Sequence, residues 1–468
     1  MAKRVITSSE NLARLLSRSG CVLDLRCGGS GKCGRCRVKL VSGEWESAGT
    51  AVTPPCEVLA CRTHLTGRAG VVEVPEAPEA DPAVEMALSD RVVLKPTAET
   101  VMALDVGTTT LAAVTIREGK VIASAGCFNA QSRYGDNVIS RIAHAATPHG
   151  MDDLRTALAE SLAELAAELD LSRVSRVAVA GNTVMLSLLF GVDPSPIGAY
   201  PFTPKCLTFP EHNDLFGELP VSAVPCISGF LGGDITAGLL VAALTPGDML
   251  VDLGTNCEIV FNTGNGWLGT TAAAGPAFEG AGLRCGCRAV AGAVDHYRGP
   301  GDFSVIGGGT PRCGLCGSAY VDYLAVEHRA GRIDRFGRFR NPAEHCRELA
   351  PGLPIGEDDL EQLLKAKAAI GSGIASLEKY CGKTADRIFL AGGFASVLDI
   401  DNAMAIGMLP AGREFVILGN SSLAGAAALA TDPGLMPELL RLSKLPKELP
   451  LAGLPDFERT FADALLLD

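Results

Sequence analysis

A short pattern of buried strand, Asp-x-Gly-Thr turn and second strand occurs twice in the chain. In the first copy, the apolar residues 101–104 lead into Asp105-Val-Gly-Thr, and another apolar run follows. In the second copy, residues 249–251 lead into Asp252-Leu-Gly-Thr, again followed by an apolar run. One such turn would be a weak signal, because the same tetrapeptide occurs in ordinary β-turns. Its repetition with flanking strands predicts a duplicated α/β domain.

Both turns carry the groups that hold a phosphate. Glycine permits a tight turn, threonine hydroxyls and backbone N–H groups donate hydrogen bonds to phosphate oxygens, and the aspartate can hold Mg²⁺ through water. Two copies facing one another would clamp a triphosphate from both sides, so we expect ATP with Mg²⁺ as ligands. The residues that carry this prediction are Asp105 and Asp252 as catalytic acids, with Gly107, Thr108, Thr109, Gly254 and Thr255 around the phosphates.

Cysteines are concentrated near the start of the chain. Cys27, Cys33 and Cys36 follow one another within a glycine-rich segment, and Cys61 comes later. Thiolates at this spacing can wrap a loop around a [2Fe–2S] cluster, and the glycines let backbone N–H groups approach its sulfides. The alternatives are a structural zinc site and unligated core cysteines. We therefore expect Cys27, Cys33, Cys36 and Cys61 to be the cluster ligands.

Two other cysteines lie close to this motif. Cys56 competes with Cys61 as the fourth ligand, but it follows two prolines on an expected loop. Cys61 is therefore favoured. Cys21 is expected in the core beneath the cluster loop.

Composition limits the classes of function that fit. With 468 residues, of which 47% are hydrophobic and 20% charged, the chain is long enough for about two or three compact domains. A net charge of −12 disfavours nucleic acid, because phosphates repel an acidic surface. Residues 1–10 form no signal peptide, and the longest apolar stretch, 224–244, is interrupted by Asp234. We expect a cytoplasmic protein with reduced cysteines, no membrane span and no nucleic-acid partner.

A segment rich in proline and glutamate divides the chain. It spans residues 75–82 and is too stiff and polar to fold on its own. Before it, residues 38–41 and 71–74 are expected strands of a ferredoxin domain whose opening β-hairpin is clipped, because few residues precede Cys27. The expected organisation is a [2Fe–2S] ferredoxin domain at 1–75, a linker at 76–97, ATPase subdomains at 98–248 and 249–432, and a tail at 433–468 that packs on the ATPase.

The chain resembles a known family over nearly its whole length. Its two hairpins, with a further strand and glycine turn at 387–394, resemble the ATPases of the acetate and sugar kinase, Hsp70 and actin superfamily. Joined to the cysteine motif, they resemble the reductive activators of corrinoid proteins, which fuse a [2Fe–2S] ferredoxin to such an ATPase. The matching segments are residues 129–142, 181–185, 193–196, 201–204, 252–258, 274–281, 314–318, 390–394, 419–422 and 455–465.

The resemblance implies the fold and further site residues. The fold is α/β, with a small β-grasp-like [2Fe–2S] ferredoxin domain followed by a duplicated ATPase of the acetate and sugar kinase, Hsp70 and actin type. Family members often carry an extra middle domain before the first hairpin, for which this chain leaves little room. The additional residues implied to contact the nucleotide are Asn256, Glu258, Glu279, Gly392 and Gly393.

The resemblance also implies an activity. It is the ATP-dependent, one-electron reduction of inactive Co(II) to Co(I) in a corrinoid protein of a methyltransferase system, fed by an upstream electron donor, and it is compatible with a homodimer. A plant-type [2Fe–2S] centre lies near about −400 mV, and corrinoid Co(II) is expected to need a lower potential. A gap of about 200 mV corresponds to about 4–5 kcal/mol. ATP can supply this by changing how the partner is bound.

Two alternative functions fit the same motifs. The first is an ATP-driven activator of another low-potential metalloenzyme. The second is a small-molecule kinase of the same superfamily, although a fused redox domain would then be idle.

Other polar groups have plain structural explanations. His296 is expected to form a surface or loop pair with Asp295. Asn129, Gln131, Arg133 and Arg141 are expected on a loop that enters a helix, where they are either solvated or act in the cleft or in partner docking. A second metal site is less favoured than simple burial, because cysteine is readily buried. Its ligands would be Cys285, Cys287, Cys313 and Cys316.

Overall fold

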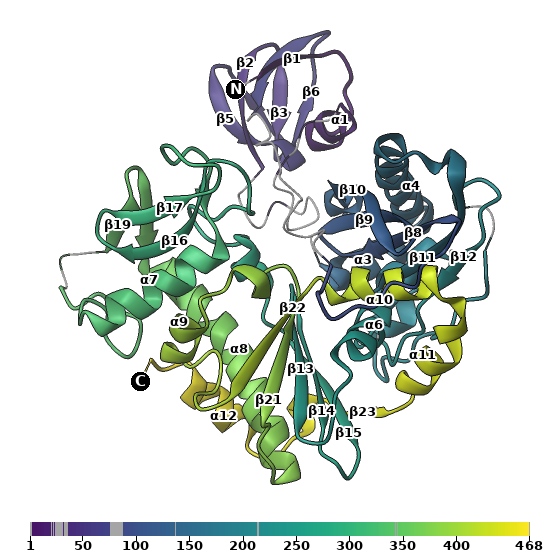
Figure 1. Ribbon diagram of the computed structural model, residues 1–468. Coiled ribbons are helices and arrows are strands. Elements are labelled where there is room, and N and C mark those ends of the chain that lie inside the picture. The colour runs from purple at the N-terminus through teal and green to yellow at the C-terminus, as the bar shows by residue number, and fades with distance from the viewer. Residues whose placement is uncertain are drawn as a thin grey trace.

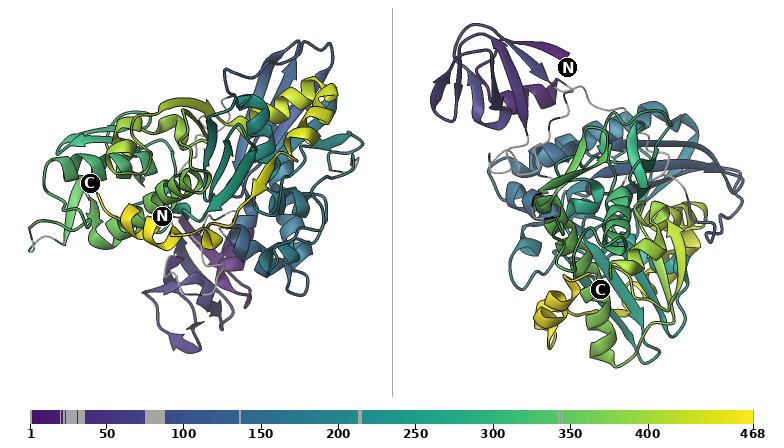
Figure 2. Two further views of the ribbon diagram at one scale, coloured as in Figure 1. Left: turned by 90° about the horizontal axis from the view of Figure 1, so that it is seen from below. Right: turned by 90° about the vertical axis from the view of Figure 1, so that its left-hand side faces the viewer.

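The computed structural model describes a small β domain and two larger α/β lobes (Figure 1). The residues described are 2–19, 21, 23, 31, 36–74, 88–135, 137–212, 215–341, 343 and 345–467. Cys27 and Cys33, two of the predicted cluster ligands, lie outside these residues. The views in Figures 1 and 2 place the small domain beyond one end of the paired lobes.

The N-terminal domain is built from short antiparallel strands and one helix. One sheet has the order β1-β7-β2-β5 and a smaller one the order β4-β3-β6. Side chains such as Leu40, Trp45 and Val72 are almost fully buried between them. The elements are β1 (Ala2–Ile6), α1 (Leu12–Arg18), β2 (Arg37–Ser42), β3 (Trp45–Ser47), β4 (Thr50–Val52), β5 (Cys56–Leu59), β6 (Thr63–Leu65) and β7 (Gly70–Val74).

Both strands predicted in this domain are present, although each extends beyond its predicted ends or begins before them. Residues 38–41 lie in β2 and residues 71–74 in β7, and the two strands pair antiparallel. The chain opens with β1, which pairs antiparallel with β7 and so supplies an edge strand where a clipped hairpin was expected. Cys56 begins β5 opposite Leu40, so its predicted place on a loop is wrong.

The first lobe contains a mixed sheet in the order β10-β9-β8-β11-β12. β8 and β9 form an antiparallel hairpin, and β11 runs parallel to β8. Helices on one face share a core with the sheet, in which Leu158, Val179 and Leu186 are buried. The elements are β8 (Thr100–Val106), β9 (Thr110–Arg117), β10 (Lys120–Phe128), α3 (Val138–Ala145), α4 (Gly150–Glu168), β11 (Val174–Gly181), α5 (Thr183–Leu189) and β12 (Val221–Ala223).

The second lobe repeats this topology. Its sheet has the order β22-β21-β13-β14-β15-β23, with β13 and β14 antiparallel and β21 parallel to β13. β13, β14, β15, β21 and β22 therefore take the places of β8, β9, β10, β11 and β12, which confirms the predicted duplicated α/β fold. The strands are β13 (Asp248–Leu253), β14 (Cys257–Asn262), β15 (Trp267–Ala272), β21 (Arg387–Ala391) and β22 (Glu414–Gly419).

Two helices cross between the lobes. α6 (Gly233–Ala242) follows the first sheet in sequence, but its Ile235 packs with Leu250 of the second sheet. α10 (Ser421–Thr431) follows the second sheet, but its Leu423 packs with Val101 of the first sheet, as its course beside β8 and β11 in Figure 1 shows. Each lobe is therefore packed against a helix that the other lobe contributes. The predicted boundary between the ATPase subdomains at residue 248 stays a prediction.

The remaining elements extend the second lobe and its tail. β16 (Ala293–Gly299), β17 (Asp302–Val305) and β18 (Gly314–Leu315) form a small sheet that α7 (Gly317–Arg329) covers. In the tail, β23 (Pro446–Glu448) runs parallel to β15, and α12 (Phe457–Ala464) packs on α8 (Glu357–Cys381). The other elements are β19 (Cys346–Ala350), β20 (Leu353–Gly356), α9 (Ile400–Ala405) and α11 (Met436–Leu442). Among the described helices, none has the length and apolar character needed to cross a bilayer.

Candidate functional site

The first Asp-x-Gly-Thr turn joins β8 to β9 at the wall of a cleft between the lobes. A Cβ atom at Gly107 would lie 2.6 Å from the carbonyl oxygen of Thr110, so only glycine fits this turn. Asp105 lies at the end of β8 and accepts a hydrogen bond from Ser422 Oγ (2.7 Å) and one from Asn420 Nδ2 (3.1 Å). The start of α10, a helix that follows the second sheet, therefore orients a predicted catalytic acid of the first lobe.

The second turn joins β13 to β14 on the opposite side of the cleft. Its backbone is closed by a hydrogen bond from Gly254 N to the carbonyl of Asn256 (3.0 Å). Gly392 has φ of 94° and approaches this turn so closely that a Cβ atom would lie 2.7 Å from the carbonyl oxygen of Leu253. The glycine turn after β21 thus packs against the second hairpin.

All the residues predicted to bind nucleotide line one cleft. They come from both hairpins, from the turn before Glu279 and from the glycine turn after β21. Their roles toward a ligand stay predictions, but the fold brings them together from widely separated parts of the chain. They are Asp105, Gly107, Thr108, Thr109, Asp252, Gly254, Thr255, Asn256, Glu258, Glu279, Gly392 and Gly393.

A group of carboxylic acids lies deep in this cleft. Burial, with the neighbouring carboxyl groups adding to it, raises the pKa of Asp234 to about 8 and that of Asp252 to about 7. Burial also raises the pKa of Asp105, against hydrogen bonds that lower it, and raises that of Glu258 well above its ordinary value. A divalent cation would relieve this repulsion, so the acids fit Mg²⁺ held through water.

Sequence reasoning missed several residues of the cleft. Asp234 was noted only as an interruption of an apolar stretch, yet it lies at the start of α6 and faces the cleft. Asn182 donates from Nδ2 to Thr108 Oγ1 (3.0 Å), and Asn420 and Ser422 hold Asp105. Asn182, Asn420 and Ser422 could have been found from the resemblance of segments 181–185 and 419–422 to the family.

A buried polar cluster supports the first hairpin from behind. Asn129, Gln131 and Arg141 have no exposed surface. Asn129 Nδ2 donates to the carbonyl of Gly107 (2.9 Å), and the Arg141 guanidinium donates to the carbonyl of Thr108 and to Gln131 Oε1. The expectation that these residues are solvated or act in the cleft is therefore wrong for all three. Asn129 and Arg141 satisfy buried hairpin carbonyls, and Gln131 donates to the carbonyl of Leu154 while it accepts from Arg141.

The described part of the cluster motif fits its predicted role. Cys36 and Cys61 are both buried in the core of the N-terminal domain, and Ala60 N donates to the carbonyl of Cys36 (2.8 Å), which holds the two segments together. Gly31 has φ of 77°, and a Cβ atom there would overlap the side chain of Arg62. Gly31 therefore lies directly beside the segment that carries Cys61. Cys21 lies in the core, as predicted.

The second set of cysteines forms an apolar cluster. Cys313, Cys316 and Cys287 pack with Val290 and Ala293. A hydrogen bond that the Cys287 thiol donates to Cys316, together with burial, raises the pKa of Cys287, so its thiol stays protonated. Within the described residues, no three or more His, Cys, Asp and Glu side chains are arranged to hold a metal ion directly. Cys316 is buried and Cys287 and Cys313 are half-buried, and the preference for packing over a second metal site stays a prediction.

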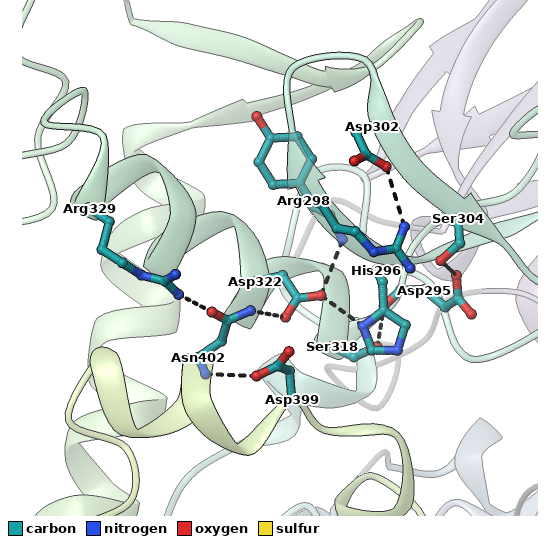
Figure 3. A network of polar contacts seen from close by, with 11 residues as sticks. Asp295, His296, Arg298, Asp302, Ser304, Ser318, Asp322, Arg329, Asp399 and Asn402 are labelled. Atoms are coloured by element: carbon teal, nitrogen blue, oxygen red, sulfur yellow. Dashed lines mark hydrogen bonds and ion pairs between the residues drawn. The ribbon is translucent and has the colours of Figure 1, made fainter. Parts of the chain in front are cut away.

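A network of polar contacts fixes the small sheet beside the cleft (Figure 3). His296 Nδ1 lies 2.8 Å from Asp322 Oδ2, so its predicted pairing with Asp295 is wrong. Asp322 is nearly fully buried and also accepts from Asn402 Nδ2 (2.7 Å). Ser318 lines the cleft and donates to the carbonyl of Asp295 (2.6 Å). The network thus ties β16, α7 and α9 to the cleft wall, and the carboxylate raises the pKa of His296.

Models of known families match nearly the whole chain. Residues 4–66 match the 2Fe-2S iron-sulfur cluster binding domain. Residues 100–246 match the RACo middle region, and residues 247–468 match the C-terminal domain of RACo, the ASKHA domain. The region that these models call middle is therefore present and forms the first lobe. The expected lack of a further domain before the first hairpin stays a prediction.

Individual relatives agree with the family models. The chain is 31% identical over 377 residues to the corrinoid activation enzyme RamQ of Eubacterium limosum, covering 69% of this chain and 63% of the relative. It is 26% identical over 359 residues to the [Co(II) methylated amine-specific corrinoid protein] reductase of Methanosarcina barkeri, covering 66% of each. The chain thus spans slightly less than two thirds of the length of these curated relatives.

A solved structure extends the likeness to the full chain. A reductive activator for a corrinoid, iron-sulfur protein superposes with a TM-score of 0.72 at 25% identity, covering 99% of this chain and 96% of that one. The same order of ferredoxin domain, first lobe and second lobe is therefore common to the family models and to this structure. The chain belongs to the family of reductive activators of corrinoid proteins, in which a [2Fe–2S] ferredoxin domain precedes an ASKHA domain.

Proposed function

We propose that the protein uses ATP to drive the one-electron reduction of inactive Co(II) to Co(I) in a corrinoid protein of a methyltransferase system. The observation that carries this proposal is the cleft, where one Asp-x-Gly-Thr hairpin from each lobe faces the same space. The named relatives, which are a corrinoid activation enzyme and a corrinoid protein reductase, support the choice of partner.

The cleft would hold the nucleotide through the two hairpins. Thr108 and Thr109 of the first and Thr255 of the second place hydroxyl donors on opposite sides of the phosphates. Asp105 and Asp252 would act as catalytic residues by holding Mg²⁺ through water. Their raised pKa values fall when a cation binds, because the cation stabilises the ionised form.

The N-terminal domain would hold the redox group through Cys27, Cys33, Cys36 and Cys61. A bound [2Fe–2S] cluster supplies one-electron transfer at a potential near about −400 mV. The described residues contribute the buried Cys36 and Cys61 and the close approach of Gly31 to Arg62. An upstream donor would have to return one electron after each turnover.

The lobes would transmit the nucleotide state to the partner. α6 and α10 cross between the sheets, so a ligand that draws the two hairpins together moves both sheets at once. A nucleotide can shift this equilibrium only by binding one arrangement of the lobes more tightly than the other. The partner would then be bound in the arrangement in which its cobalt accepts an electron more readily.

Replacing Asp105 or Asp252 by asparagine tests this coupling. We expect ATP-stimulated formation of Co(I) in a reduced mixture with the corrinoid protein to fall by more than about tenfold, because metal and phosphate positioning is worth several kcal/mol. The measurement is the Co(I) absorbance under anaerobic conditions, with and without ATP. The [2Fe–2S] absorbance of both variants is expected to be unchanged.

Cys61→Ser is the reciprocal control. It is expected to lose the cluster spectrum while retaining nucleotide binding, because the cysteine lies in the N-terminal core, apart from the cleft. Full ATP-dependent Co(II) reduction by both aspartate variants would refute the proposed coupling.

A further inference from the structure

Glu279 lines the cleft at the end of a tightly packed turn. It ends the short turn Pro276–Glu279, which has Gly275 (φ 73°) before it and Gly280 (φ 76°) after it. A Cβ atom at Gly280 would overlap the backbone of Cys287, so the turn packs tightly against the following segment. The carboxylate of Glu279 is therefore placed by the backbone on both sides of it.

This carboxylate bridges the two hairpins. Thr109 Oγ1, from the first lobe, donates to Glu279 Oε2 (2.9 Å). Thr255 Oγ1, from the second lobe, donates to Glu279 Oε1 (2.6 Å). Each carboxylate oxygen thus takes the hydroxyl of one hairpin. A second contact across the cleft comes from the same segment, where the Arg288 guanidinium lies 4.3 Å from the ring centre of Phe128.

A terminal phosphate and this carboxylate would need the same donors. Both are anionic oxygen acceptors, and a hydroxyl has only one proton to donate. The threonine hydroxyls therefore cannot serve Glu279 and a third phosphate at the same time, and the two negative charges would repel one another. A nucleotide with a third phosphate must move Glu279, whereas a diphosphate leaves these hydroxyls to it.

We propose that Glu279 distinguishes nucleoside triphosphate from diphosphate by occupying the place of the terminal phosphate. The inference rests on the proposed function of the cleft as a nucleotide site. Entry of the terminal phosphate breaks both threonine contacts and releases the segment that runs from Gly275 to Arg288. Loss of that phosphate by hydrolysis lets the carboxylate return, which joins the hairpins again.

Glu279→Gln tests the proposal, because glutamine keeps the shape and removes the negative charge. We expect the variant to bind a non-hydrolysable ATP analogue with Mg²⁺ about tenfold more tightly than the unchanged protein, which is about 1.4 kcal/mol. Its affinity for ADP is expected to change by less than about twofold, because ADP does not compete for the two hydroxyls. Isothermal titration calorimetry with both nucleotides measures the difference, and circular dichroism checks the fold.

The matched control is Glu361→Gln. Glu361 is an exposed residue of α8 that pairs with Lys365, so this change alters the net charge equally but leaves the cleft intact. Both affinities are expected to stay as they were. Equal tightening for ADP and the analogue by Glu279→Gln would overturn the discrimination, and weaker binding of the analogue would show that Glu279 supports the nucleotide. If the unchanged protein binds neither nucleotide, the proposed nucleotide site itself fails.

Discussion

Single residues in the cleft work against the stability of the fold. Burial raises the pKa of Asp234 to about 8, with the charges of Asp252 and Asp105 adding to it, and raises the pKa of Asp252 to about 7, with the charge of Asp105 adding to it. A buried charge without a partner is costly, and proteins keep such groups where a ligand or a cation compensates them. These buried carboxyl groups therefore indicate a binding site, because they destabilise the folded protein unless a ligand or cation is bound beside them.

The pH dependence of stability should reveal Asp234. Its folded pKa of about 8 is above its ordinary value of 3.8, so the folded state binds this proton more tightly than the unfolded state. The contribution to the free energy of unfolding is complete below about pH 4 and is lost as the pH rises toward about 8. In EDTA and without nucleotide, Asp234→Asn should therefore raise Tm relative to the unchanged protein, and by more at high pH than at low pH.

Differential scanning fluorimetry from about pH 5.5 to pH 8.5 measures this difference. A gain of about 1 kcal/mol corresponds to about 2–4 °C in a domain of this size. The control is Asp90→Asn, at an exposed position outside the cleft. A Tm difference that is the same at all pH values would contradict the assigned burial of Asp234.

At the scale of elements, the two crossing helices determine how the lobes are joined. α6 and α10 meet at Gly425, where a Cβ atom would lie 2.5 Å from the Cβ of Ala237. The small residues let the helix backbones approach closely, and each helix then buries its apolar side on a sheet from the other half of the repeat. The junction between the lobes therefore contains a tightly packed helix pair.

Gly425→Ala should destabilise this crossing. The added methyl group would force the two helices apart, and overpacking of this kind costs about 1–3 kcal/mol. The expected result is a lower Tm and weaker stimulation of Co(II) reduction by ATP, because the lobes no longer move together. Gly453→Ala is the control, since the nearest atom to its added Cβ is 3.7 Å away. Equal Tm values for both variants would argue against a tight crossing.

At the scale of the whole molecule, the N-terminal domain and each of the two lobes have their own hydrophobic core. The N-terminal domain buries its own cluster of apolar residues, which includes Leu12, Trp45 and Val72. The two lobes have large cores of their own, and further clusters combine helix and sheet residues from both lobes. Nucleotide binding is therefore expected to affect both lobes as a unit and to leave the ferredoxin core unchanged.

Hydrogen exchange tests this expectation on the full chain. A non-hydrolysable ATP analogue with Mg²⁺ should slow exchange in β8–β9 and in β13–β14 together, because one ligand would bridge both hairpins. Exchange in β2 and β7 of the N-terminal domain should not change. Protection confined to one lobe would show that the nucleotide does not span the cleft.

Local patterns determined much of this protein. Several features can be recognised from residues that are close in sequence. They are the apolar strands that end at Asp105 and Asp252, the glycines that the following turns require, and the spacing of Cys27, Cys33, Cys36 and Cys61. The duplicated fold and the family could therefore be predicted from the sequence, and the same local reasoning placed the predicted strands within one or two residues.

Contacts between distant residues were decided only by the tertiary structure. Asp234 reaches the cleft because α6 crosses to the second lobe, Arg141 is buried because it binds the back of a hairpin, and His296 pairs with Asp322 because α7 covers β16. The bridge from Glu279 to Thr109 and Thr255 needs both lobes in place. The physical reason is that hydrogen bonding and burial depend on which surfaces pack together, and no pattern of adjacent residues encodes that choice.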